Sequence, residues 1–350
     1  MSQHIRIARR TIGPGRPVYI VAEISANHRQ KYEEAVRLVH AAKKAGADAV
    51  KLQTLTPDTI TLRSDRPVFR VGGGTLWDGR TLYDLYEETY MPWEWQPRLK
   101  RVANGLGLDL FSSPFDPTAV SFLEKMGVPA FKVASFEIVD LPLIERMART
   151  RKPLIISTGM ATLAEIKDAV DTARSAGAKR VALLKCNSGY PAPPEEMNLR
   201  TISDMQRRFR VPVGLSDHTL GIAAPIAAVA LGACIIEKHF TLSRGVPGPD
   251  SAFSLEPLEF KAMVDGVRTV ERALGRRRYG PTPAEAKSLA FRRSLFVVRY
   301  TRKGEMFTKD NVRSIRPSNG LHPRHLPRIL GRRARVDIAA GTPLRWNLVA

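Results

Sequence analysis

Polar and charged side chains that could carry chemistry follow a series of short apolar runs in this sequence. Lysine and histidine recur among them, and these residue types bind anions or metals and transfer protons. Four lysines, together with His218 and His239, at equivalent places exceed what a structural rim of loops needs, so we interpret the set as a site. In chain order the groups are Glu23, Asn27 and His28; Lys51 and Gln53; Ser112, Ser113 and Asp116; Lys132, Ser135 and Glu137; Ser157 and Thr158; Lys185, Asn187, Ser188 and Tyr190; Ser216, Asp217 and His218; and Glu237, Lys238 and His239.

The lysines predict a site for an anion. Ammonium groups and Ser or Thr hydroxyls bind phosphate and carboxylate oxygens. The alternative is a lysine that forms a Schiff base with a carbonyl substrate, as in some aldolases, with Lys132 or Lys185 as the nucleophile. The anion site would be lined by Lys51, Lys132, Lys185 and Lys238.

Two histidines, His218 and His239, follow the last two apolar runs. If those runs are neighbouring strands, the two imidazoles can share one divalent metal ion. A site with only two protein ligands keeps positions open for substrate and water, which suits polarisation of a carbonyl better than a structural zinc. The alternative is that each histidine is an ordinary hydrogen-bonded residue.

The elements that must position these residues alternate along the chain. Eight strand–helix units over about 275 residues are typical of an α/β fold, the (β/α)₈ TIM barrel, whose active site lies at the carboxyl ends of the strands. A doubly wound open sheet is disfavoured because no glycine-rich dinucleotide fingerprint follows the first strand. Strands are predicted at 18–22, 49–53, 109–111, 130–134, 154–156, 181–184, 213–215 and 235–237. Helices are predicted at about 32–45, 93–106, 117–126, 141–150, 162–176, 197–209, 221–231 and 256–274.

The same reading divides the chain into a barrel domain at 1–275, a basic linker at 276–290 and a small β-rich domain at 291–350. In the small domain, β-like runs are predicted at 294–300 and 335–338. Within the barrel, the segment 54–92 is too long for an ordinary strand–helix turn. Its three consecutive glycines and many aromatic residues predict a folded lid or wall over the site.

Composition limits the class of protein. The chain has 350 residues, 43% of them hydrophobic, which supports a large core and excludes disorder as the main state. The formal net charge is +21, but no zinc-finger spacing or aromatic-interleaved RNA motif accompanies it. We therefore expect no nucleic-acid partner. The charge is either a solvated basic surface or attracts an anionic substrate, and it does not decide between these alternatives by itself.

The start of the chain and its cysteines predict a location in the cytoplasm. The basic start is not followed by an apolar signal-peptide core, and the two cysteines, Cys186 and Cys234, stand in apolar contexts that suit a reducing compartment. The uncharged stretch 220–236 contains two glycines and a proline and runs directly into Glu237. We interpret it as a buried helix and strand rather than a membrane span.

Short motifs follow one another across the whole predicted barrel. They are Ala22–His28 (AEISANH), Lys51–Thr54 (KLQT), Ser112–Asp116 (SSPFD), Phe131–Ser135 (FKVAS), Ser157–Met160 (STGM), Gly214–Thr219 (GLSDHT), Glu237–Thr241 (EKHFT) and Gly248–Asp250 (GPD). In this order the motifs resemble the sialic acid synthase family. The tail, with Ile315–Pro317 and Asn319–Leu321, resembles the antifreeze-like SAF domain that these synthases carry.

The resemblance implies condensation of phosphoenolpyruvate with the open-chain aldehyde of an acylamino sugar, giving a nine-carbon 2-keto sugar acid and phosphate. Gly74–Gly79, Leu82–Tyr86 and Pro92–Trp95 are most similar to the pseudaminic acid synthase branch, whose acceptor is 2,4-diacetamido-2,4,6-trideoxy-L-altrose. An aromatic wall suits that less polar sugar. N-acetylneuraminate and legionaminate synthases are the alternatives. Serine at 188, where neuraminic acid enzymes have asparagine, argues against N-acetylmannosamine.

Residue roles also follow from the resemblance. His218 and His239 would bind Mn²⁺ or Mg²⁺, and Glu23 and Glu237 are the candidate catalytic carboxylates, with Glu23 assisting water addition at C2. The contacts to phosphoenolpyruvate would come from Lys51, Ser113, Lys132, Ser135, Ser157, Ser188 and Ser216. The contacts to the sugar would come from Gln53, Glu137, Tyr190, Asp250 and Arg316. Because Arg316 would reach the barrel of a partner subunit in this family, a domain-exchanged homodimer is implied.

Overall fold

The computed structural model describes residues 3–350, which form two compact units. The first unit runs up to Gly275 and the second from Arg276 to Ala350. The first two residues of the domain predicted at 1–275 lie outside the described residues. The two units are described one after the other.

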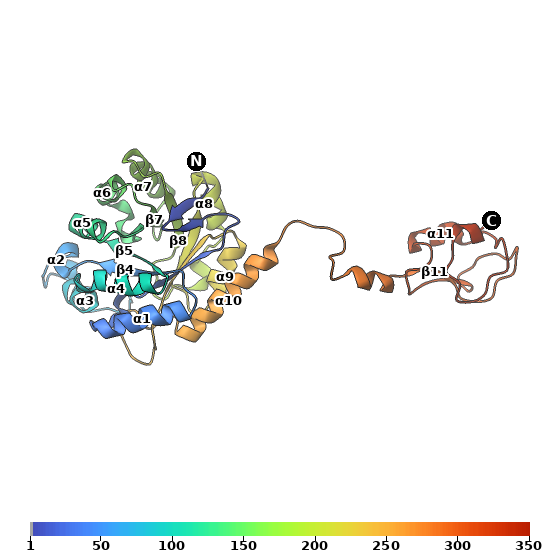
Figure 1. Cartoon of the computed structure of the whole chain (residues 1–350), viewed down its shortest axis with the longest axis horizontal. Coiled ribbons are helices and arrows are strands. Elements are labelled where there is room, and N and C mark those ends of the chain that lie inside the picture. Colours follow the sequence, from blue (N-terminus) through green and yellow to red (C-terminus); the bar gives the residue numbers. More distant parts are fainter. Residues whose placement is uncertain (1–2) are drawn as a thin grey trace. The chain divides into compact units, whose positions relative to one another are not determined.

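The first unit is a closed barrel of eight parallel strands surrounded by helices (Figure 1). Each strand pairs with the next, and the last strand pairs with the first, so that His239 lies opposite Glu23. The predicted (β/α)₈ barrel is confirmed, and every predicted strand overlaps an observed one. The strands are β3 (Tyr19–Glu23), β4 (Ala49–Thr54), β5 (Asp109–Pro114), β6 (Phe131–Val133), β7 (Leu154–Ser157), β8 (Val181–Cys186), β9 (Val213–Asp217) and β10 (Ile235–His239).

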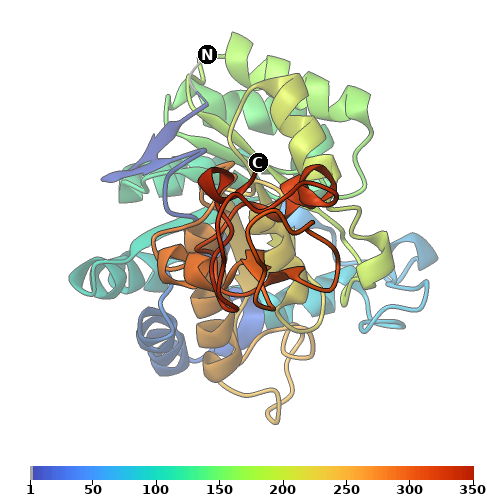
Figure 2. The ribbon, with the colours of Figure 1, turned by 90° about the vertical axis from the view of Figure 1, so that its right-hand side faces the viewer.

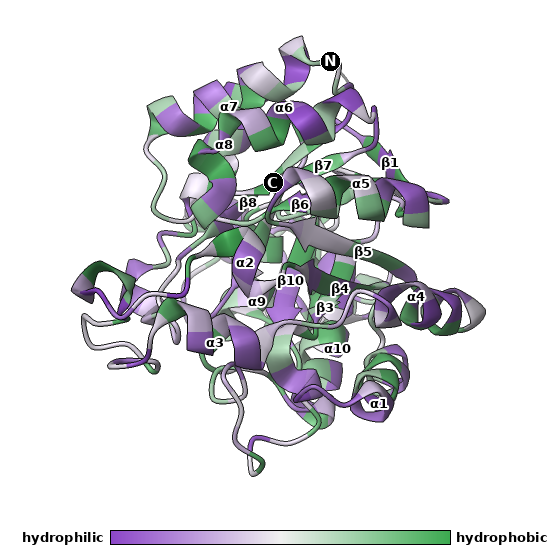
Figure 3. Ribbon diagram, turned by 90° about the vertical axis from the view of Figure 1, so that its left-hand side faces the viewer, coloured by the Kyte–Doolittle hydropathy of each residue, from purple (hydrophilic) through white to green (hydrophobic). Residues whose placement is uncertain are grey.

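Eight helices follow the strands and pack apolar residues on the barrel. All are amphipathic except α9, which is apolar throughout; polar and apolar residues alternate around α1 and α4 in Figure 3. Local signals set their ends. In α5, the Asp116 side chain accepts hydrogen bonds from two backbone N–H groups, and Gly127 ends the helix with a φ of 71°. The helices are α1 (Tyr32–Lys44), α4 (Trp95–Gly105), α5 (Pro117–Met126), α6 (Leu141–Arg149), α7 (Leu163–Ser175), α8 (Thr201–Phe209), α9 (Ala223–Ala230) and α10 (Pro257–Leu274).

Two parts of this unit differ from expectation. The helix predicted from residue 197 begins only at Thr201, because Asn198 has a φ of 46°, which a right-handed helix cannot include. A short turn, η4 (Pro194–Glu196), precedes it. An N-terminal hairpin, β1 (Ile5–Ile7) and β2 (Arg10–Ile12), was not predicted, although its isoleucines are buried in the main core.

The long segment after β4 is folded, as predicted. It contains α2 (Pro57–Ile60), η2 (Pro67–Phe69) and α3 (Leu82–Thr89), and its two halves are joined by a bridge between Arg70 and Thr81. The N-terminus of α3 is capped by the Thr81 side chain, which accepts from the backbone of Asp84. Another short helical turn, η1 (Ser25–His28), follows β3, and η3 (Phe136–Val139) follows β6.

The uncharged stretch 220–236 forms α9 and the beginning of β10, which confirms its interpretation as a buried helix and strand. In the described part of the chain, no helix is long and apolar enough to cross a membrane.

The second unit has its own small core, which contains Leu295, Phe307, Ile329 and Leu344. Its ribbon is drawn in orange to red in Figure 2. The run predicted at 335–338 is not a strand, because only Ile338 forms an isolated bridge, to Thr301. The elements are η5 (Ala286–Phe291), β11 (Ser294–Val297), antiparallel β12 (Val312–Ile315), η6 (Pro323–His325), α11 (Leu326–Ile329) and η7 (Trp346–Leu348).

Candidate active site

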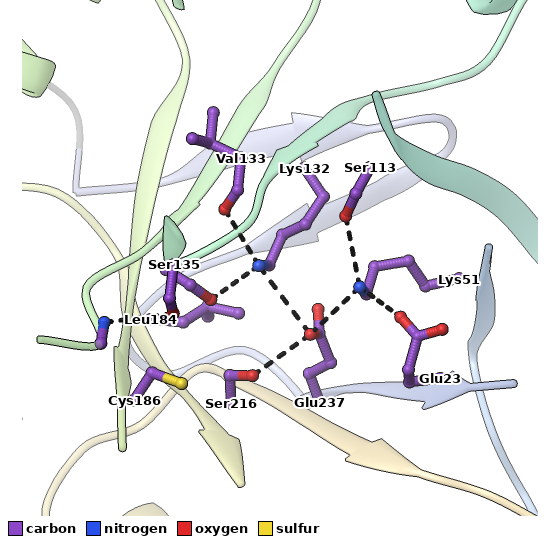
Figure 4. A network of polar contacts seen from close by, with 12 residues as sticks. Glu23, Lys51, Ser113, Lys132, Val133, Ser135, Leu184, Cys186, Ser216 and Glu237 are labelled. Carbon is purple, nitrogen blue, oxygen red and sulfur yellow. Dashed lines mark hydrogen bonds and ion pairs between the residues drawn. The ribbon is translucent and has the colours of Figure 1, made fainter. Parts of the chain in front are cut away.

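The carboxyl ends of the barrel strands bring buried charges together inside the ring (Figure 4). Lys51 of β4 forms an ion pair with Glu23 of β3, and its Nζ lies 3.4 Å from Glu237 Oε1 of β10. Lys132 of β6 approaches the same oxygen at 3.9 Å. Lys51 also donates to Ser113 Oγ at 3.3 Å. Two cations and two carboxylates from four strands therefore share one buried cluster.

The cluster sets unequal proton affinities on its two carboxyl groups. Burial raises the pKa of Glu23 to about 7 against the attraction of Lys51, and repulsion by Glu237 acts in the same direction. Burial also acts to raise the pKa of Glu237, but Lys132 and Lys51 outweigh it and lower that pKa. Glu237 is thus held as an anion, whereas Glu23 can gain or lose a proton near neutrality, as a general acid or base must.

The four lysines predicted to line one anion site do not all do so. Lys132 Nζ donates to Ser157 Oγ at 2.6 Å, and Lys185 Nζ donates to the Cys186 carbonyl at 2.8 Å; burial lowers the pKa of both. Lys238 belongs elsewhere. It alternates with Glu237 and His239 along β10, and its Nζ binds Asp217 Oδ2 at 2.5 Å on the other side of the strand. Its inclusion in the anion site was wrong.

Three short loops form a tight polar cradle beside these lysines. The backbone N–H of Gly159 donates to Ser135 Oγ at 3.2 Å. A Cβ at Gly159 would lie 2.2 Å from Ser188 Oγ and 2.7 Å from Ser135 Oγ, so only glycine fits there. Ser188 Oγ is buried and has no hydrogen-bond partner among the described residues. Such a hydroxyl is suited to binding an oxygen of an anionic ligand.

The two predicted metal ligands lie side by side, with their imidazole centroids 5.3 Å apart. His218 Nδ1 lies 2.7 Å from the Asn187 carbonyl, so it carries the proton and leaves Nε2 for a metal. Burial, with the charges of His218 and nearby lysines, lowers the pKa of His239 far below its usual value and keeps its imidazole neutral. Burial also lowers the pKa of His218, but Cys186 and Asn187 raise it on balance.

The donor set fits a divalent ion held by the imidazole nitrogens of His218 and His239. His239 Nδ1 is buried and lacks a hydrogen-bond partner within residues 3–350. Over the same residues, no group of three or more His, Cys, Asp or Glu side chains is arranged as a metal site. The protein would therefore supply two ligands, and the substrate and water would supply the others.

Aromatic side chains enclose the histidine pair. The Tyr190 ring lies 4.3 Å from that of His218 and 5.2 Å from that of Phe253. Trp77, from the long segment after β4, lies 5.7 Å from Tyr190 and donates from Nε1 to the Pro249 carbonyl at 3.1 Å. The segment thus reaches across the barrel mouth and forms part of the wall. Phe253 was not singled out from the sequence, because nothing in its loop marks it.

Polar residues predicted to contact the sugar lie on the same side. Gln53 Nε2 donates to Ser25 Oγ at 2.9 Å, and Ser25 Oγ donates to Asp250 Oδ2. Burial raises the pKa of Asp250, while its bonds to Ser25 and Ala26 oppose that shift. Ser25 was missed as a functional residue, although it lies inside the motif that begins at Ala22.

Glu137 and Arg316 are the two remaining residues predicted to contact the sugar, and they lie in different units of the chain. Burial raises the pKa of Glu137 to about 7, and its Oε2 has no hydrogen-bond partner among the residues described. Burial and the charge of Glu137 together raise the pKa of Tyr86, a residue of α3. Arg316 follows β12 and is exposed in the second unit, so its contact with the sugar stays a prediction.

With this geometry, comparison with known proteins decides the family. A model of the NeuB family matches residues 38–279. The chain belongs to the NeuB family. A SAF domain model matches residues 292–350, which confirms the predicted nature of the second unit.

Several NeuB relatives match along nearly the whole chain. The pseudaminic acid synthase of Campylobacter jejuni is 46% identical over 94% of this chain and 95% of its own length. The pseudaminic acid synthase of Helicobacter pylori is 46% identical over 94% and 96%. Among solved structures, the N-acetylneuraminic acid synthetase of Leptospira borgpetersenii in complex with citrate has a TM-score of 0.73 at 30% identity, covering 83% of this chain and 96% of that chain.

Proposed function

We propose that this NeuB-family protein is a pseudaminic acid synthase. It would condense phosphoenolpyruvate with 2,4-diacetamido-2,4,6-trideoxy-L-altrose to give a nine-carbon 2-keto sugar acid and phosphate. The observation that carries the proposal is a buried lysine–serine cluster beside two neighbouring imidazoles, in a chain 46% identical to pseudaminic acid synthases over 94% of its length. The aromatic wall of Trp77, Tyr190 and Phe253 supports an acceptor with a 6-deoxy carbon.

Phosphoenolpyruvate would bind to the lysines and hydroxyls. Lys51 and Lys132 supply charge-assisted hydrogen bonds to its carboxylate and phosphate, and the serines complete the shell. Because Ser188 Oγ is unpartnered and Gly159 leaves room beside it, an oxygen of the substrate can enter the cradle. The proposed binding residues are Lys51, Ser113, Lys132, Ser135, Ser157, Ser188 and Ser216.

His218 and His239 would hold the divalent metal, Mn²⁺ or Mg²⁺. When bound, the metal supplies a Lewis acid that polarises the aldehyde oxygen of the sugar. The neutral state of His239 and the carbonyl contact of His218 both favour ligation. Asp250 Oδ2 lies 3.9 Å from His239 Nδ1 and would help to orient that ring.

The chemical steps need one proton carrier and one fixed anion. C3 of phosphoenolpyruvate attacks the aldehyde carbon, and positive charge develops at C2. Glu23 then accepts a proton from the water that adds to C2 and passes it to the aldehyde oxygen, which becomes a hydroxyl group. The C2 hydroxyl group of this intermediate gives its proton to the departing phosphate as the C2–O bond to phosphate breaks, which leaves a keto group at C2. The pKa of Glu23, about 7, suits this transfer of a proton. Glu237, an anion in the same cluster, would stabilise the positive charge at C2.

The sugar would be held by Gln53, Glu137, Tyr190 and Asp250, and by Arg316 from a partner subunit. We therefore also propose a domain-exchanged homodimer, and we propose that the enzyme works in the cytoplasm.

The deciding experiment is a panel of acceptor sugars. Purified protein is incubated with phosphoenolpyruvate, Mn²⁺ and each sugar, and phosphate release is measured. We expect turnover with the diacetamido-trideoxy-altrose. Turnover only with N-acetylmannosamine or with the legionaminic acid precursor would overturn the assignment to pseudaminic acid. Trapping of a lysine adduct with pyruvate and borohydride would instead indicate the Schiff-base aldolase.

A further inference from the structure

Ser25 has a backbone conformation that serine rarely adopts. Its φ is 37°, in the left-handed region, and the residue is 4% exposed. Strained residues of this kind persist only where the surrounding structure holds them, and they concentrate at functional sites. One contact that holds Ser25 is the hydrogen bond from its backbone N–H to Glu23 Oε1, at 2.7 Å. In this conformation the hydroxyl group of Ser25 forms hydrogen bonds with Gln53 and Asp250.

The hydrogen bonds of that hydroxyl have only one possible direction. Ser25 Oγ has a single proton, and as a carboxylate Asp250 can only accept, so the proton goes to Asp250 Oδ2. Ser25 Oγ must then accept from Gln53, 2.9 Å away. Only the amide nitrogen of Gln53 can donate, so its side chain must turn Nε2 towards Ser25 Oγ.

This chain of bonds determines what the two side chains offer to a ligand. With Nε2 bound to Ser25, Gln53 keeps its carbonyl oxygen for the ligand. With Oδ2 occupied, Asp250 keeps Oδ1. Both are acceptors, and an acylamino sugar offers hydroxyl and acetamido N–H groups as donors. Among the residues described, the Ser25 hydroxyl forms no hydrogen bond with the residues proposed to bind phosphoenolpyruvate.

We infer that Ser25 is a positioning residue for the acceptor sugar, whose hydroxyl fixes Gln53 and Asp250 so that each presents an oxygen acceptor to it. This inference rests on the proposed function, because it takes an acylamino sugar as the ligand. It adds a residue that acts through two others, and it predicts an effect on the sugar that is separate from any effect on phosphoenolpyruvate.

Two substitutions separate the hydroxyl from the strain. Ser25→Ala keeps the strained backbone and removes the hydroxyl, whereas Ser25→Gly removes both. We expect kcat/KM for the sugar to fall about 10- to 100-fold in both variants, the range for hydrogen bonds that involve charged groups. We expect the KM for phosphoenolpyruvate to stay within about twofold of wild type. The glycine variant should melt at or above the temperature of the alanine variant.

A third variant tests whether Ser25 acts through its neighbour. Gln53→Ala should lower kcat/KM for the sugar, and adding Ser25→Ala to it should lower that value much less than Ser25→Ala does in the wild type. If the losses of kcat/KM in the two single variants are fully additive in the double variant, Ser25 does not act through Gln53. An unchanged kcat/KM for the sugar in Ser25→Ala, or an equal rise of both KM values, would overturn the inference as a whole.

Failure of the proposed function gives a different pattern. In that case wild-type protein releases no phosphate with any sugar of the panel. Binding of the diacetamido-trideoxy-altrose, measured by calorimetry, then tests Ser25 without turnover. Weaker binding to Ser25→Ala than to wild type would support the role of Ser25, and equal binding, or none to either protein, would refute it.

Discussion

Replacing Glu137 with glutamine should change how the stability of the chain depends on pH. Burial raises the pKa of this carboxyl from 4.5 to about 7, so the folded chain holds the proton more tightly than the unfolded chain does. Between these two values the folded state binds more protons, and stability falls as the pH rises. The stabilising contribution is complete below pH 4.5 and is lost as the pH passes through about 7.

The size of the effect follows from the same shift. A change of about 2.5 pKa units corresponds to about 3 kcal/mol at 1.36 kcal/mol per unit, which is an upper limit. Glutamine has nearly the same shape and no charge to bury. Relative to wild type, Glu137→Gln should therefore gain up to about 3 kcal/mol between pH 5 and pH 8. Urea denaturation of both proteins at several pH values measures this difference.

A control and a refuting result complete the test. Glu33→Gln removes an exposed carboxylate on α1 and reproduces the change in net charge, so its difference from wild type should not grow with pH in the same way. If the difference between Glu137→Gln and wild type is constant from pH 5 to pH 8, burial does not raise the pKa of Glu137, and the electrostatic reasoning fails.

Three further predictions concern the binding sites. Gly159→Ala should raise the KM for phosphoenolpyruvate about tenfold or more, because its Cβ would overlap two serine hydroxyls. Gly105→Ala, with open space around its Cβ, is the control. If steady-state assays give Gly159→Ala the same KM for phosphoenolpyruvate as wild type, the cradle does not bind this substrate. Lys51→Met should destabilise the chain by about 3–5 kcal/mol, because it leaves a buried Glu23 without its partner. Urea denaturation should show that Lys51→Met/Glu23→Gln recovers most of this loss; no recovery would mean that the charge of Glu23 is not responsible. His239→Ala should weaken Mn²⁺ binding, followed by electron paramagnetic resonance, about tenfold or more, and a chelator should stop phosphate release by the wild type until Mn²⁺ is restored. Unchanged Mn²⁺ binding would remove His239 from the metal site.

The sequence predicted the barrel because a buried parallel strand produces a short apolar run. All eight runs were recognisable, and the polar residues that follow them were therefore assigned to the correct end of the barrel. The adjacency of His218 and His239 followed from strand order alone. Lys238 shows the limit of this reasoning. It was grouped by its position after a run, whereas the alternation of side chains along β10 directs it away from Glu237 and His239.

Contacts between distant parts of the chain could not be predicted in the same way. Ser25 and Asp250 are 225 positions apart, and their bond exists only when η1 and the loop after β10 lie together. The close approach at Gly159 likewise depends on three separate loops. The hairpin of β1 and β2 was missed because strands of three residues are too short to show a periodic pattern.

The closure of the ring between β3 and β10 has a consequence for how the protein is made. The ion cluster lies across that seam: Glu23 comes from the first strand of the barrel, and Glu237 from the last. A ribosome delivers the first strand more than two hundred residues before its partner. Until β10 emerges, its two neighbours in the ring, β3 and β9, each have an open edge, and the carboxylate of Glu237 is missing. The reaction centre therefore comes into existence in a single late event, and a nascent chain cannot hold a partly working version of it.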